Sequence, residues 1–159
     1  MKIIIRQKYK LILFFFFYLT VDILQGLIGV IAATVVWFIV GALVYMNPFV
    51  AKIYKKYEDD PSVKNRKDIK TFIINTFIFS VLIQCFIFSF VYLYIKPILP
   101  GTLILNALYF GIILIAVKII PRLFDMYVQS KYPTKLLIIE WINGIIGSFV
   151  IAIVFALIL

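Results

Sequence analysis

The sequence predicts an all-α polytopic membrane protein, a transmembrane helix bundle with a four-helix core and an N-terminal hydrophobic extension. Apolar residues make up 65% of the chain, and the mean hydropathy is +1.12. They form runs long enough to cross a bilayer, which takes ~20 residues at a rise of 1.5 Å each. Within the runs they are consecutive, which argues against a membrane β-barrel, whose strands alternate, and against a soluble bundle, whose helices have a polar face.

The length of the chain allows one membrane domain. Apolar runs at residues 11–46, 71–94, 101–120 and 136–159 are separated by short charged stretches. We divide the chain into an N-terminal hydrophobic extension, residues 1–26, and a four-helix transmembrane domain, residues 27–159. The longest polar loop of this domain is residues 47–70.

The distribution of charge predicts the orientation of the core. The loop at residues 47–70 and the last loop, residues 118–135, are two crossings apart and therefore share a side of the membrane. Together they hold 11 Lys and Arg residues, against one, Lys96, between the second and third crossings. The positive-inside rule places both loops in the cytoplasm, so we expect a plasma-membrane protein. The net charge of +9 then fits anionic lipids at the cytoplasmic face rather than nucleic acid.

The first apolar run, residues 11–46, does not fit a single crossing. As one helix it would be ~54 Å long, against a hydrocarbon core of ~30 Å. Three arrangements remain open: a short extra helix that turns back near residues 22–26, one long helix, and an interfacial helix that never crosses. The start of the chain also resembles a signal peptide, but no small-x-small site follows its apolar core, so we expect it to be retained.

The polar loop contains a predicted amphipathic helix. Asn47 and Pro48 end the first crossing. Aromatic and apolar residues then recur on one face of residues 49–57, with lysines between them, which is typical of a helix on the cytoplasmic membrane surface. Asp60 and Pro61 end this helix and suit the first positions of a further turn. We expect the helix to anchor the protein; docking of a lipid headgroup or a partner is the alternative.

Two rows of small residues predict close helix packing in the first and last crossings. Membrane helices associate by packing, and small side chains let a second backbone approach closely. The rows can serve the internal bundle or a homo-oligomer, and the internal contact is favoured because a small bundle must first pack itself. The residues concerned are Gly29, Ala33, Gly41, Gly144, Ser148 and Ala152.

Few polar side chains interrupt the crossings, and Glu140 most needs an explanation. An acidic residue at mid-membrane costs up to ~3 kcal/mol on insertion scales, so we expect it to be paired, protonated or near the interface. Lys118 and Arg122, at the end of the preceding crossing, are its candidate partners. An ion pair that fixes two helix ends is favoured over a proton- or ion-handling role. Amides that can hydrogen-bond between helices are Gln84, Asn106 and Asn143.

Composition excludes several kinds of site. The chain has no histidine and a single cysteine, Cys85, which excludes a His-ligated haem, a Cys/His zinc site, an intrachain disulfide and catalysis by a His base. Helix termination explains the only acidic cluster, residues 58–60. We therefore expect no enzyme, no catalytic residue, no metal and no cofactor.

Two stretches resemble an uncharacterised family of membrane proteins. Residues 40–49, VGALVYMNPF, resemble the end of the first helix in the family called domain of unknown function 1761. Residues 132–140, YPTKLLIIE, with Asn143 and Gly144, resemble its final helix. Val44 stands where the family usually has Trp, and the final helix lacks a histidine. The resemblance covers about residues 32–159, implies a four-helix layout, and implies no mechanism because the family has no established activity.

Two functions follow as hypotheses. The first is a small non-enzymatic membrane protein that acts through helix–helix or lipid contacts, as a subunit or homo-oligomer, with no nucleic-acid partner. The alternative is a small channel or transporter that uses Glu140, Lys118 and the amide side chains.

Overall fold

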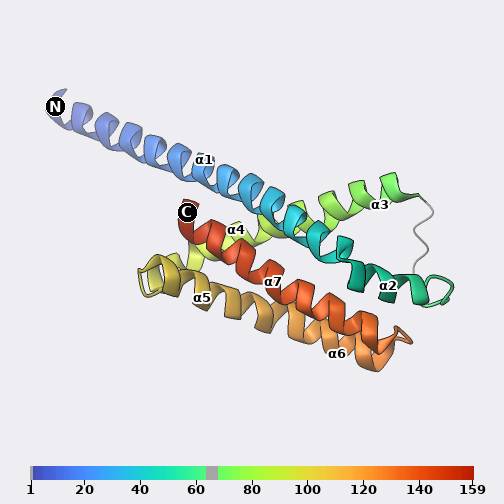
Figure 1. The fold of residues 1–159 in the computed structure, drawn as a ribbon. Helices are drawn as coiled ribbons and strands as arrows, with labels where there is room; N and C mark the ends of the chain where they lie inside the picture. The colour runs from blue at the N-terminus through green and yellow to red at the C-terminus, as the bar shows by residue number, and fades with distance from the viewer. Residues whose placement is uncertain (1, 64–67) are drawn as a thin grey trace.

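The computed structural model describes residues 2–63 and 68–159, and the regular elements within these ranges are helices (Figure 1). Four helical segments of the described chain are long and apolar enough to cross a membrane: Ile23–Met46, Lys70–Ile98, Leu103–Gln129 and Thr134–Ile158. The predicted all-α architecture with four membrane helices is confirmed, and the protein is an integral membrane protein.

The first helix, α1 (Lys2–Met46), is continuous. Of the three arrangements open from the sequence, the one long helix forms, and the chain does not turn back near residues 22–26. Figure 1 shows the N-terminal part of α1 extending beyond the other helices. Its C-terminal half packs against α7 (Thr134–Ile158) and α4 (Ile83–Ile95).

Side-chain caps delimit the helices of the polar loop. Asn47 Oδ1 accepts a hydrogen bond from Phe49 N at 2.9 Å, and the predicted amphipathic helix forms as α2 (Pro48–Lys56). The hydroxyl and the N–H of Ser62 donate to Asp60 Oδ1 and hold the pKa of this carboxyl below its usual value. Asp68 caps α3 (Ile69–Asn75) in the same way through Thr71.

The second and third crossings each contain a π-helical segment. The second runs through α3, η1 (Thr76–Leu82), α4 and the 3₁₀ turn η2 (Lys96–Ile98). The third runs through α5 (Leu103–Leu114), η3 (Ile115–Ile119) and α6 (Ile120–Gln129). A π turn interrupts the regular i→i−4 hydrogen bonding, as where the N–H of Ile120 reaches Ile115 O.

The third crossing is therefore longer than the sequence pattern predicts. The pattern ends it at residue 120, before Pro121, because proline normally stops a helix. In the structure Pro121 follows η3, so its missing N–H falls where the regular ladder is already interrupted, and the helix continues to Gln129. Lys118, which the pattern puts in the last turn of the crossing, and Arg122, which it puts after the end, consequently both lie inside the crossing.

The turn between η2 and α5 depends on two residues. Gly101 has φ +85°, in the left-handed region that favours glycine. Its N–H donates to Asn106 Oδ1 at 3.0 Å, and Asn106 is only 8% exposed. This amide stabilises the turn, a role that the sequence pattern did not predict.

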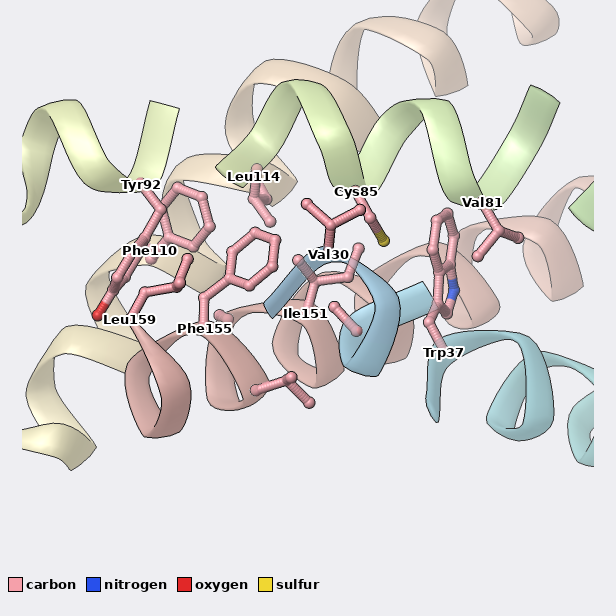
Figure 2. Packing of buried hydrophobic residues seen from close by; sticks show 13 residues of the cluster. Val30, Trp37, Val81, Cys85, Tyr92, Phe110, Leu114, Ile151, Phe155 and Leu159 are labelled. Carbon is pink, nitrogen blue, oxygen red and sulfur yellow. The ribbon is translucent and has the colours of Figure 1, made fainter. Parts of the chain in front are cut away.

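Helix α7 is the centre of the bundle and packs most extensively against α5 and α1. Near the end formed by η2 and Gly101, the rings of Tyr92, Phe110 and Phe155 meet in a buried cluster (Figure 2). Ring centroids are 5.0 Å apart for Tyr92 and Phe110 and 6.2 Å for Phe110 and Phe155. Many apolar residues on the outside are exposed, as is normal for helices that face lipid.

The two small-residue rows lie on helices that face each other, α1 and α7. The side chain nearest to Gly29 is that of Leu159, Gly147 faces Trp37, and Gly41 faces Asn143. The remaining small residues of the rows are fully buried: Ala33, Ser148 and Ala152. Gly144 instead faces Ile119 of η3. The rows thus bring α7 close to two other crossings within one chain.

Candidate functional site: a cavity between the crossings

A cavity of about 550 Å³ lies between the four crossings, at the end of the bundle that carries α2, α3 and α6. Its volume falls within the range of small-molecule sites, roughly 300–1,000 Å³. Most of its wall is apolar. Aromatic and aliphatic residues from all four crossings contribute to it, among them Trp37, Phe38, Phe72, Val81, Leu123 and Trp141.

The cavity forms where the second and third crossings diverge. Figure 1 shows α3 and α6 pointing away from each other at this end of the bundle. Both π-helical segments border the cavity, through Ser80 and Val81 of η1 and through Lys118 and Ile119 of η3. π-helical turns are rare and occur frequently at functional sites, which singles out this region.

Lys118 is the buried cation of the cavity. Its Nζ lies 4.2 Å from the ring centroid of Trp37 and 5.5 Å from that of Phe88. The atom is buried and has no hydrogen-bond partner in the described part of the chain. Aromatic faces attract an ammonium group but give its three N–H donors no acceptor. A lysine within a membrane helix costs ~2.5–3.5 kcal/mol on insertion scales, so such residues usually mark a functional site.

Glu140 borders the same cavity and is held by a tyrosine. Its Oε1 accepts a hydrogen bond from the Tyr54 hydroxyl at 2.7 Å, which ties α2 to α7. The Tyr54 ring also meets Tyr45 edge-on, with centroids 5.7 Å apart. The sequence pattern favours Lys118 or Arg122 as the partner of Glu140. The sequence contains only a weak signal for Tyr54 as the partner: this residue is predicted on the same side of the membrane as Glu140, and its hydroxyl can donate a hydrogen bond.

The Tyr54 hydroxyl remains a proton donor over a wide pH range. Burial raises its pKa well above the ordinary value of 10.0, and the charge of Glu140 and its hydrogen bond raise it further. The pKa of this hydroxyl is higher in the folded protein than in the unfolded chain, where it is 10.0. The stabilisation that the protonated hydroxyl gives to the fold is therefore complete below pH 10.0 and decreases only as the pH rises above that value. The link between α2 and α7 therefore persists at neutral pH.

Two amides also belong to the polar part of the lining. Asn143 Nδ2 donates to the Tyr45 hydroxyl at 3.4 Å. Asn143 Oδ1 and Gln84 Oε1 are buried and, within the residues that the structure describes, accept no hydrogen bond. Buried polar atoms are nearly always paired, so these two acceptors, on residues that line the same cavity as Lys118, favour a site for a bound molecule or water.

Five of the six polar residues singled out from the sequence border this one cavity: Gln84, Lys118, Arg122, Glu140 and Asn143. The sixth, Asn106, lies at the Gly101 turn instead. Gly41 and Gly144 of the small-residue rows also border the cavity. The cavity thus brings together five side chains that the sequence analysis named as candidates for one intramembrane polar group.

Tyr54→Phe is expected to loosen α2 from α7. The variant keeps the ring contact with Tyr45 and removes one hydrogen bond to a carboxylate, at a cost of ~1–2 kcal/mol. Amide hydrogen exchange in detergent should become faster across α2, with little change in α5. Tyr57→Phe, one residue past the same helix, is the matched control. Equal exchange of α2 in the two variants would show that the hydrogen bond does not hold this helix.

The helices and the cavity define a four-helix integral membrane protein with a partly polar site inside its membrane domain. The chain belongs to the family described as protein of unknown function (DUF1761), which it matches over residues 28–156. The resemblance seen in its sequence is thereby confirmed. No curated protein and no solved structure matches the chain, so a function has to be argued from the cavity itself.

Proposed function

We propose that the protein binds a lipid-like molecule within the membrane and catalyses no reaction. The cavity of about 550 Å³ carries this proposal, because apolar walls with a few convergent polar groups are typical of a binding site. All four crossings contribute to its walls, so a bound molecule would contact the whole fold. With the polar loops in the cytoplasm, as the positive-inside rule favours, the cavity lies in the inner half of the plasma membrane.

The packing supports binding over conduction. A conduction path needs a wet or polar route through the whole bundle. At the end of the bundle opposite the cavity, the space between the helices is filled by Tyr92, Phe110 and Phe155, which are 1%, 0% and 0% exposed. A channel or transporter based on Glu140 and Lys118 would have to open this cluster in every cycle.

The partners that fit best are lipids of the cytoplasmic leaflet. The exposed lysines of α2, Lys52, Lys55 and Lys56, suit an anionic membrane surface. The small-residue rows are used in contacts within the chain, between α1 and α7 and between α7 and η3. They therefore offer no packing surface for a second copy, and we propose lipid rather than a homo-oligomer as the principal partner.

Tryptophan fluorescence provides a direct test of occupancy. The chain has two tryptophans, Trp37 and Trp141, and both line the cavity. In a Trp141→Phe background, Trp37 reports alone, and at 8% exposed it is shielded from the surrounding micelle. Titration with an uncharged brominated amphiphile, dibrominated stearyl alcohol, in mild detergent should quench Trp37 in a saturable manner.

A cavity-filling variant should abolish the saturable quenching. Ser80→Phe adds a ring at a residue of η1 that lines the cavity, whereas Ile83→Phe adds one at an exposed residue of the same crossing outside the lining. The Ser80 variant should weaken binding by about tenfold or more, and the Ile83 variant should behave as the parent. Quenching that rises linearly without saturation, or is equal in the two variants, would contradict the proposal.

A further inference from the structure

We propose that the bound molecule is an amphiphile with one anionic headgroup, a carboxylate or a phosphate, and that the Lys118 ammonium binds this headgroup. The inference rests on the proposed function, since it names the class of molecule that the cavity takes. Three properties of the described residues support it: the surroundings of Lys118, the charges around the cavity, and the apolar rim.

The surroundings of Lys118 leave its donors available. Trp37 and Phe88 lie beside the ammonium group, and their aromatic faces stabilise the positive charge without accepting its N–H groups in the ordinary way. Lys118 is one of the residues that line the cavity, and its buried Nζ has no hydrogen-bond partner in the described chain. An oxyanion at this position would receive charge-assisted hydrogen bonds, which are the stronger kind. Gln84 and Asn143 line the same cavity, and their unpaired carbonyl oxygens can accept hydrogen bonds from a hydroxyl group of the bound molecule or from water, but not from the oxyanion itself.

The charges around the cavity favour an anion. Two cations, Lys118 and Arg122, stand four residues apart on the third crossing, and one carboxylate, Glu140, faces them from α7. Glu140 accepts its hydrogen bond from the neutral Tyr54 hydroxyl, while the Lys118 ammonium has no hydrogen-bonded acceptor among the residues that the structure describes. A buried charge is stabilised chiefly by a paired and hydrogen-bonded counter-charge.

The rim of the cavity favours an amphiphile over a free anion. Met46 at the end of α1 and Ile73 of α3 border the cavity and are 76% and 46% exposed. Both lie in membrane-spanning segments, and with the exposed Trp141 they make much of the rim apolar, while the exposed Ser80 and Arg122 also line the cavity. A headgroup at Lys118 would therefore leave an acyl chain in contact with the apolar wall and the bilayer.

The test compares two brominated amphiphiles that differ only in charge. Quenching of Trp37 is measured in the Trp141→Phe background with dibrominated stearate and with dibrominated stearyl alcohol, at a pH at which the acid is ionised. We expect the acid to saturate the site at a mole fraction about tenfold lower than the alcohol. Equal affinities would contradict the proposal of an anionic headgroup but would leave the proposal of a binding site standing. Absence of saturable quenching by either compound would overturn the proposed function itself.

Matched variants assign the preference to Lys118. Lys118→Gln should make the two affinities nearly equal, and Lys118→Arg should keep the preference for the acid. Lys135→Gln removes one positive charge from the same end of the bundle, outside the cavity lining, and should leave the preference unchanged. A preference retained by Lys118→Gln, or lost equally in Lys135→Gln, would show that Lys118 does not bind the headgroup. If Lys118→Gln does not fold, the comparison of the two amphiphiles in the Trp141→Phe protein and in its Lys118→Arg variant keeps the test decisive.

Free anions form the final arm of the test. Acetate and inorganic phosphate share the headgroup chemistry but have no acyl chain. At millimolar concentration neither should displace dibrominated stearate from the wild-type protein. Displacement by either anion would show that the cavity binds a free anion and would contradict the proposal that it binds an amphiphile.

Discussion

Gly147→Ala is expected to destabilise the bundle by ~1–3 kcal/mol, the usual cost of overpacking a tight contact. A Cβ at residue 147 would lie 2.8 Å from both Cδ1 and Cε2 of the Trp37 indole, and closer still to Nε1. The indole is rigid, only 8% exposed and flanked by Lys118, so it resists displacement. Either the ring is pushed toward the cavity that it lines, or helices α1 and α7 separate. Thermal unfolding of the purified protein in mild detergent measures the effect.

Two comparisons show whether the contact with Trp37 is the cause. Gly41→Ala lies in the same pair of helices, but its Cβ would be an ordinary 3.8 Å from Asn143 Oδ1, so this variant should melt close to the wild type. In a Trp37→Phe background, which has a smaller ring, Gly147→Ala should cost less than in the wild type. Equal melting of the Gly147 and Gly41 variants would contradict the close approach of α1 to α7.

The membrane crossings could be predicted because they are local properties of the sequence. About 20 consecutive apolar residues form a helix in lipid whatever surrounds them, since the backbone has no other way to satisfy its hydrogen bonds there. The end of α1 at Asn47 and Pro48 follows from the same kind of local rule. Spacing of small residues likewise pointed to the faces of α1 and α7 that meet.

The cavity could not be predicted, because it depends on irregular backbone and on long-range packing. No residue pattern marks a π turn, and Pro121 normally indicates a helix end, so the pattern puts Lys118 at the end of the third crossing rather than inside it. The high cost of a membrane carboxylate identified Glu140 as a residue that needs a partner. Which partner it has is decided by the packing of α2 on α7, between residues 86 positions apart in the chain.

Phe110→Ala is expected to be the most destabilising of the substitutions considered, by ~3 kcal/mol or more. Phe110 has no exposed surface and contacts the rings of Tyr92 and Phe155, so its removal leaves a void between α4, α5 and α7. Within a membrane the loss is one of packing contacts, because lipid chains are as apolar as the side chain and water is not the alternative environment.

Phe79→Ala is the matched control for Phe110→Ala. Phe79 lies on the second crossing and is 64% exposed, so lipid or detergent can fill the space that its ring leaves. Its cost should stay within ~0.5 kcal/mol, as for substitutions away from a packed contact. Phe110→Leu, which keeps most of the volume, should fall between the two. If Phe110→Ala and Phe79→Ala melt alike in detergent, the three rings do not form a packed cluster, and the support that they give to binding over conduction is lost.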